Sequence, residues 1–233
     1  MNRVKTGVPG LDELLDGGFP DPSTILITGP TGSGKSVLGV QYLYNGAKDY
    51  KEPGFMISTE DYVTDFQWHQ EAFKWNFKAL QDQGLLVFSR YDPVDFPKFN
   101  VRTLYADIVL QLTKVIDSMK VKRVVFDNIS PIGQYINDKS TFRTILYYIS
   151  KALKEKGCTT IFVSEKPFTP GAMTQFDVEQ YVVDGVLDLS FAQKEDALVP
   201  TLTVRKMIAT NIPQARYAMD FFEGGIRIAS SYY

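Results

Sequence analysis

Cysteine and histidine are almost absent from this chain of 233 residues, which contains one of each. The single cysteine, Cys158, has no partner for a disulfide within the chain. A structural zinc site needs more cysteine and histidine ligands than the sequence offers. Catalysis through an imidazole would have to use His69, which stands beside Trp68 in an aromatic-rich segment and is more typical of packing. The sequence therefore directs the search toward carboxylates, lysines and backbone amides.

Strong charge and long apolar runs are missing as well. The 25 basic and 27 acidic residues give a formal net charge of −2, so the surface as a whole does not attract nucleic acid. No run approaches the roughly 18 apolar residues of a membrane-spanning helix, and residues 1–10 lack the apolar core of a signal peptide. We therefore expect a cytoplasmic protein without membrane insertion.

Short apolar strands alternate with helical segments through most of the chain. Strands are expected at 24–29, 55–59, 85–89, 123–126 and 159–163, and helices at 35–48, 65–80, 101–119 and 140–156. From residue 186 onward strands alternate with turns instead, at 186–190, 202–207, 217–222 and 226–228. This order predicts an α/β fold with a mostly parallel central sheet, helices on both faces and antiparallel strands at the C-terminus. No linker rich in proline, glycine or serine divides the chain, so we expect one domain over residues 1–233.

A glycine-rich segment at 29–36 has the spacing G-x-x-x-x-G-K-[ST] of a phosphate-binding P-loop, or Walker A motif, and lies between an expected strand and an expected helix. The glycines let successive backbone N–H groups point inward around a phosphate, and the helix start adds unpaired amides. The candidate nucleotide-binding residues are Gly29, Pro30, Thr31, Gly32, Ser33, Gly34, Lys35, Ser36 and Val37. Lys35 would reach the β- and γ-phosphates, and Ser36 would ligate Mg²⁺. The alternative is a glycine-rich strand–helix turn with an incidental lysine.

Asp127 follows the apolar strand 123–126, as the carboxylate of a Walker B segment does. There it would hold a water molecule of Mg²⁺ or polarise the Ser36 hydroxyl. The alternative is an aspartate that simply starts the following loop. ATP and Mg²⁺ are therefore the ligands that the sequence leads us to expect.

Several further segments resemble the KaiC-like ATPases, which belong to the RecA-like P-loop NTPases. They are Thr6-Gly7, Gly10-Leu11-Asp12, Leu14-Leu15, Gly17-Gly18-Phe19-Pro20, Trp75 with Gly84-Leu85-Leu86-Val87, the stretch 179–189 and the stretch 205–226. The resemblance covers nearly the whole chain and is loose around 90–120 and 166–178. It implies a RecA-like ATPase domain of the archaeal, single-domain type.

The resemblance also implies catalytic roles. In the family, the second strand ends in two acidic residues that activate the attacking water, and here this position reads Glu60-Asp61. Carboxylates at the C-terminal tip of a parallel strand face the ligand crevice, which agrees with that role. Glu60 is the candidate general base with Asp61 in support, unless both are solvated loop acids. Ser164, which Glu165 follows after the fifth strand, is the candidate reader of the γ-phosphate, unless it merely caps a strand.

The sequence differs from the family at the residues that a neighbouring subunit contributes to the site. Relatives place a Lys-x-Arg pair on the γ-phosphate of the adjacent copy, and here Lys206 is present, with Thr210 shortly after, while Ile208 stands at the arginine position. An arginine at such a site is worth about 10³–10⁵ in rate. Slow hydrolysis is therefore expected unless Arg205 or Arg216 substitutes.

A second departure concerns phosphorylation of the protein itself. The clock protein of the family autophosphorylates an adjacent Ser-Thr pair, and the matching residues here are Gln180-Tyr181. Autokinase activity is therefore not expected.

Three functions remain open at this stage. The leading hypothesis is Mg²⁺-dependent ATP binding with slow hydrolysis, coupled to assembly of a homo-oligomer such as a hexamer or to an unidentified protein partner. The second is a regulatory or assembly module with little turnover, of which the accessory ATPase of the archaellum motor is an example. The third is an ATPase of the recombinase-paralogue type that binds single-stranded DNA through loops at about 130–139 and 166–178, where basic residues are few.

Overall fold

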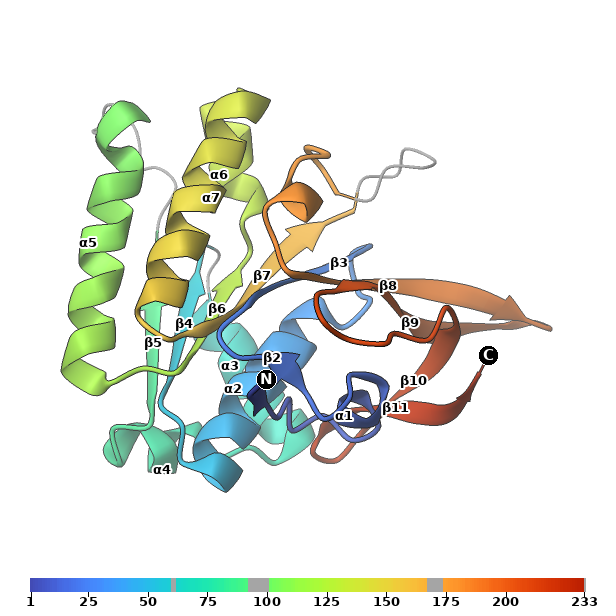
Figure 1. Ribbon diagram of the computed structural model, residues 1–233. Helices are drawn as coiled ribbons and strands as arrows, with labels where there is room; N and C mark the ends of the chain where they lie inside the picture. The colour runs from blue at the N-terminus through green and yellow to red at the C-terminus, as the bar shows by residue number, and fades with distance from the viewer. Residues whose placement is uncertain (60–61, 92–100, 167–173, 233) are drawn as a thin grey trace.

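A computed structural model describes residues 1–59, 62–91, 101–166 and 174–232 (Figure 1). Its centre is a nine-stranded sheet with the order β11-β10-β9-β8-β3-β7-β6-β4-β5. The strands that run parallel are β8 (Gly185–Lys194), β3 (Thr24–Gly29), β7 (Thr159–Glu165), β6 (Arg123–Asp127), β4 (Gly54–Ser58) and β5 (Leu86–Arg90). The antiparallel strands are β9 (Ala197–Met207), β10 (Arg216–Phe222) and β11 (Gly225–Tyr232). The predicted α/β class is confirmed.

Helices cover both faces of this sheet. The longer ones are α2 (Lys35–Tyr50), α3 (Tyr62–Phe73), α5 (Val101–Met119) and α7 (Lys139–Glu155), and the shorter ones are α1 (Leu11–Leu14), α4 (Phe77–Asp82), α6 (Ser130–Ile136) and the 3₁₀ turn η2 (Glu179–Tyr181). A separate two-stranded sheet pairs β1 (Arg3–Val4) with β2 (Phe19–Pro20). In the described part of the chain, no helix combines the length and the apolar composition that a membrane span requires.

Alternation along each strand divides the core into two layers. On one face of β3, Ile25 and Ile27 pack with α2 and α4. On the other face, Leu26 belongs to a second cluster with α5, α6 and α7. Figure 1 shows α5 and α7 side by side over that second face. The central parallel strands β3, β4, β6 and β7 are therefore buried on both sides, which explains why most of their residues are apolar.

Three expectations need correction. The segment 65–80 is not one helix, because the backbone at Lys74 turns left-handed (φ 56°) and Asn76 starts α4 by accepting a hydrogen bond from the Ala79 amide at 3.0 Å. The strand expected at 186–190 is longer, and it pairs parallel to β3, so the antiparallel part begins only at β9. The stretch 130–139 is not a loop but contains α6.

Arg123 anchors α2 to the sheet. Its side chain is completely buried, with the guanidinium carbon 4.6 Å from the ring centre of Tyr42, and Nε donates to Glu52 at 2.6 Å. Gly46 of α2 makes room for this side chain, because a Cβ there would collide with the aliphatic stem and the guanidinium. Since α2 starts at the P-loop, this packing helps to fix the loop's orientation.

We predict that Gly46→Ala lowers the free energy of unfolding by about 1–3 kcal/mol, as overpacking of a well-packed core does. Urea unfolding measures the difference, with Asp49→Ala on the exposed side of the same helix as the control. Alanine is the better helix former by about 1 kcal/mol. A variant that is as stable as the wild type, or more stable, would therefore contradict the described packing.

Candidate functional site

The P-loop lies where β3 passes into α2, at the C-terminal edge of the parallel strands. The backbone of Gly32 (φ 79°) and Gly34 (φ 95°) is left-handed, and Gly34 caps α2 without any side-chain hydrogen bond to the first amides of the helix. Ser33 is completely buried, and its Oγ has no hydrogen-bond partner among the described residues. The loop therefore presents backbone donors, as the sequence predicted for a phosphate cradle.

A cavity of about 280 Å³ opens over this loop. It is lined by Thr31, Gly32, Gly34, Lys35, Ser36, Val37, Asp127, Asn128, Glu165 and Phe221. The lining joins the P-loop to the tips of β7 and β6, which follow β3 in the sheet, and to β10, which β9 and β8 separate from β3. Two other hollows, of about 430 Å³ and 440 Å³, contain none of the residues that the sequence singled out.

Lys35, the first residue of α2, is only 8% exposed. Its Nζ donates to the Pro30 carbonyl at 2.9 Å, so the ammonium folds back over the loop. Asp127 is the last residue of β6, and it lines the same cavity as Ser36. A serine hydroxyl and a carboxylate facing one cavity are oxygen ligands of the kind that Mg²⁺ prefers.

The arrangement fits a divalent cation that arrives with its own ligands. The described residues contain no group of three or more His, Cys, Asp or Glu side chains close enough to form a metal site by themselves. A Mg²⁺ ion held by Ser36 and Asp127 would therefore complete its coordination with phosphate oxygens and water, which is its usual mode at nucleotide sites.

Comparison with known proteins agrees with this geometry. The sequence profile of the ATPase family KaiC matches residues 4–233. The chain belongs to the KaiC family of ATPases. This membership supports a nucleotide-binding ATPase of RecA-like fold.

Similar proteins come mostly from archaea. The UPF0273 protein PH0284 of Pyrococcus horikoshii is 31% identical over 96% of this chain and 92% of its own length. The circadian clock oscillator protein KaiC of Parathermosynechococcus lividus is 28% identical over 97% of this chain but only 42% of its own length. The crystal structure of the KaiC-like protein PH0186 from Pyrococcus horikoshii OT3 superposes with a TM-score of 0.85 at 30% identity, covering 98% of this chain and 99% of that one.

The acidic pair Glu60-Asp61 of this KaiC-type chain lies outside the described residues. The residue before it, Thr59, is described and is fastened to the tip of β6. Its amide donates to the Asp127 carbonyl at 3.0 Å, and its hydroxyl donates to the Asn128 carbonyl at 2.9 Å. The residue that directly precedes the acidic pair is therefore hydrogen-bonded to the backbone of Asp127, the candidate metal ligand.

Ser164 does not line the cavity. It is completely buried, and its Oγ donates to Glu179 at 3.1 Å and lies 3.5 Å from the Ser130 hydroxyl. The next residue, Glu165, lines the cavity instead. Successive side chains of a strand point to opposite faces, so the strand's exact phase decides which of the two polar residues meets a ligand.

Lys206 and Thr210 lie away from their own P-loop, toward the N-terminal ends of the parallel strands. Lys206 pairs with Val186 at the beginning of β8, and its Nζ donates to the Val183 carbonyl at 2.5 Å. Thr210 accepts a hydrogen bond from Arg3 at 2.7 Å. Through Val186, Lys206 is level with Leu26 of β3, and the P-loop begins three residues further along that strand, at Gly29. Each residue of a strand adds roughly 3.3 Å. Neither side chain belongs to the cavity of its own chain.

Phe221 is a lining residue that sequence reasoning missed. It lies in β10 and is 44% exposed, and a Cβ built on Gly34 would lie 2.8 Å from its Cζ. Nothing local in the sequence distinguishes it from Phe222, because its place beside the P-loop depends on the pairing of the last strands. An aromatic ring at the mouth of the cavity offers a flat apolar surface.

The two loop glycines make a matched pair for a stability test. Both have positive φ, but a Cβ at Gly32 would meet nothing within 4 Å, whereas one at Gly34 would meet Phe221 and, at 3.1 Å, Ile226. We therefore predict that Gly34→Ala lowers the free energy of unfolding by about 1–3 kcal/mol more than Gly32→Ala does. Urea unfolding measures both. Adding Phe221→Ala should restore part of the loss for Gly34→Ala alone, and equal losses without such rescue would contradict the contact.

Proposed function

We propose that this protein binds ATP with Mg²⁺ at the P-loop cavity and hydrolyses it slowly, and that nucleotide occupancy controls assembly with further copies of the chain or with a protein partner. The observation that carries the proposal is the cavity itself, where loop amides, the Lys35 ammonium, the Ser36 hydroxyl and the Asp127 carboxylate converge. The KaiC-like family commonly oligomerises, which agrees with assembly as an output.

Each described residue has a role that its position supports. The amides at the start of α2 would bind phosphate oxygens, and Lys35 would leave the Pro30 carbonyl to neutralise the β- and γ-phosphates. Ser36 and Asp127 would hold the Mg²⁺ ion, which stabilises the charge that develops on the phosphates. Phe221 would cover the mouth of the cavity. The residues proposed to bind nucleotide are Gly29, Pro30, Thr31, Gly32, Ser33, Gly34, Lys35, Ser36 and Val37.

Glu60 is the proposed general base, with Asp61 in support. Support comes from Thr59, the preceding residue, whose two hydrogen bonds to the backbone of Asp127 and Asn128 bring the end of β4 to the tip of β6. A base must reach the water that attacks the γ-phosphate, and the tips of these strands face the P-loop edge of the sheet.

Lys206 is proposed to act on the nucleotide of a neighbouring copy. Its position supports this, because its Nζ is bonded to the Val183 carbonyl and Lys206 is not among the residues that line the cavity of its own chain. At the neighbouring arginine position, Ile208 is 51% exposed. Arg205 donates from Nε and Nη2 to Asp188 at 3.1 and 3.0 Å, so its guanidinium is already engaged. The replacement of the arginine by Ile208 and the engagement of Arg205 support slow turnover, unless the exposed Arg216 substitutes.

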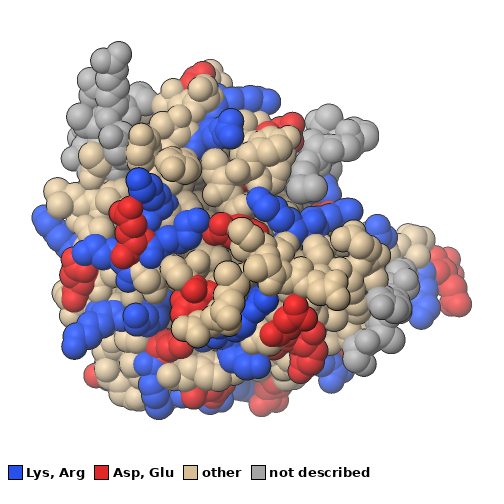
Figure 2. Space-filling model, in the orientation of Figure 1, with Lys and Arg blue, Asp and Glu red and all other residues tan. Residues whose placement is uncertain are grey.

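The same observation favours a second candidate, a nucleotide-dependent assembly module with little turnover. Single-stranded DNA binding has less support. On the face shown in Figure 2, basic and acidic side chains are interspersed, with no broad area of one sign. The proposed DNA loop 166–178 falls largely outside the described residues.

Substitutions at Lys35 and Glu60 separate binding from hydrolysis. We predict that Lys35→Ala lowers ATP affinity at least about tenfold, because it removes the main positive charge of the cavity. Glu60→Gln should retain ATP affinity but lower the hydrolysis rate about 10²–10⁴-fold, as loss of a general base does. Nucleotide titration and phosphate release measure the two quantities, with Lys48→Ala near the other end of α2 as the control. Unchanged binding and turnover in Lys35→Ala would refute the proposed site.

Mixing two inactive variants tests the role of Lys206. A Lys35→Ala chain lacks its own cavity charge but can still donate Lys206, and a Lys206→Ala chain has the complementary defect. If Lys206 acts between copies, the mixture should hydrolyse ATP faster than either variant alone. Phosphate release in the mixture at equal total protein gives the answer, and activity no higher than the average of the two separate variants would place Lys206 outside the neighbouring site.

A further inference from the structure

The charged side chains that line the cavity do not balance. The described lining contains one cation, Lys35, and two carboxylates, Asp127 and Glu165. A nucleoside triphosphate brings several more negative charges into this space. Loop amides offset some of that charge as dipoles, but they carry no net charge. Among the described residues, the side chains that line the cavity therefore carry a net negative charge before any nucleotide enters.

Glu165 is the carboxylate without an assigned role. It ends β7 directly beside Gly29, the first residue of the P-loop, and its amide donates to the Ser130 hydroxyl at 3.1 Å. Within the described part of the chain, its side-chain oxygens take part in no hydrogen bond or ion pair. The start of α2 holds the β-phosphate in a P-loop. A terminal phosphate bound in this way would face the lining formed by Lys35 and the strand tips, to which Glu165 belongs.

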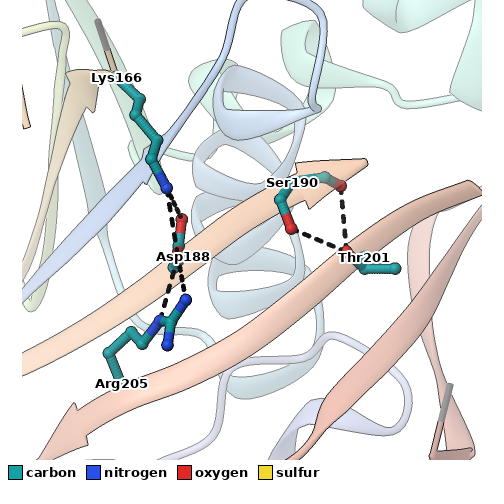
Figure 3. Close-up of polar contacts among 5 residues, drawn as sticks. All are labelled: Lys166, Asp188, Ser190, Thr201 and Arg205. Carbon is teal, nitrogen blue, oxygen red and sulfur yellow. Dashed lines mark hydrogen bonds and ion pairs between the residues drawn. The ribbon is translucent and has the colours of Figure 1, made fainter. Parts of the chain in front are cut away.

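The nearest basic residue along the chain is prevented from neutralising Glu165. Lys166 is tied by its amide to the Gly29 carbonyl at 3.1 Å, but its Nζ reaches away to Asp188 of β8, at 3.2 and 3.5 Å from the two carboxylate oxygens. Figure 3 shows Lys166 meeting Asp188 from one side and Arg205 meeting it from the other. Lys166 is not among the residues that line the cavity.

Burial of Asp188 makes this arrangement firm. Its side chain is 3% exposed, whereas those of Lys166 and Arg205 are 28% and 47% exposed. A buried carboxylate that loses its cations pays a large desolvation penalty, so both partners are held. Beside it, the Ser190 hydroxyl lies 2.9 Å from that of Thr201, which ties β8 to β9, the strand that carries Arg205 (Figure 3).

We propose that Glu165 determines nucleotide selectivity: it disfavours a terminal γ-phosphate unless a divalent cation accompanies it, and Asp188 preserves this selectivity by holding Lys166 outside the cavity. The inference rests on the proposed function, since it concerns the same nucleotide site. It makes ADP the preferred ligand when the cation is absent, and it makes the affinity for the triphosphate depend on the cation. Glu165 acts here through charge repulsion and has no assigned step in hydrolysis.

Isothermal titration of the full-length protein with ATP and with ADP, each with Mg²⁺ and with a chelator, tests this selectivity without measuring turnover. In the presence of the chelator, the wild type should bind ADP about fivefold more tightly than ATP. Repulsion between two like charges in contact in water changes an affinity by about this factor. Glu165→Gln should raise metal-free ATP affinity about fivefold and leave ADP affinity unchanged. Asp188→Asn should act in the same direction, because it releases Lys166 toward Glu165.

Matched controls separate this effect from general loss of charge. Glu155→Gln removes a carboxylate from the exposed end of α7, and Asp184→Asn breaks a similar pair, Asp184 with Lys154 at 3.0 Å, just before the other end of β8. Neither should change the ratio of ATP to ADP affinity. Thermal melting checks that every variant is folded, and if Asp188→Asn is not, Glu165→Gln decides the question.

Two results would overturn the inference while leaving the proposed function in place. One is an unchanged metal-free ratio of ATP to ADP affinity in Glu165→Gln. The other is a loss of Mg²⁺–ATP affinity in Glu165→Gln, which would make Glu165 a favourable contact and not a repulsive one. The proposed function itself would fail differently, with a wild type that binds neither nucleotide in the presence of Mg²⁺.

Discussion

The left-handed turn between β3 and α2 is the constraint on which the rest of the site depends. A chain that leaves a buried strand can start a helix immediately above it only if its backbone curls tightly, and here Gly32 and Gly34 adopt the positive φ that this requires. Gly34 also lies so close to Phe221 that a side chain at this position would collide with the ring. The turn aims the start of α2 at the strand tips, and Lys35, Asp127 and Glu165 therefore face a common space.

The sequence predicted the elements next to this turn because local rules govern them. The strand 24–29 and the helix beginning at Lys35 have their predicted bounds at the loop, and the helix 101–119 matches at both ends, since apolar periodicity and glycine punctuation are strong there. Local rules were insufficient where one backbone dihedral decides the outcome. At Lys74 a single left-handed residue divides an otherwise continuous aromatic pattern into α3 and α4.

Long-range pairing explains what the sequence could not supply about the site. Phe221 reaches the P-loop only because β10 and β11 join the sheet in a particular register. Likewise, which of Ser164 and Glu165 lines the cavity depends on which face of β7 each side chain occupies. Ser164 bonds Glu179, and Glu165 lines the cavity. The P-loop and Asp127 were found because strand-tip chemistry can be read from a short stretch of sequence.

The charged side chains near the P-loop are unevenly placed. Two carboxylates face the cavity and Lys166 is drawn off to Asp188, while Lys206 lies away from the P-loop. Among the described residues of one chain, Lys35 is therefore the cationic side chain that lines the cavity, while Lys166 and Lys206 are held elsewhere. In the proposed function, the remaining positive charge comes from a divalent ion and from an adjacent copy, which would link nucleotide binding to assembly.

A crystal structure of the protein with Mg²⁺ and a non-hydrolysable ATP analogue tests this central claim most directly. We expect phosphates within hydrogen-bond distance of the backbone amides of residues 32–36, with the metal ion between Ser36 and Asp127 and Lys206 of an adjacent copy at the terminal phosphate. An analogue bound outside the P-loop, or a complete phosphate site formed by one chain without any neighbour, would contradict it.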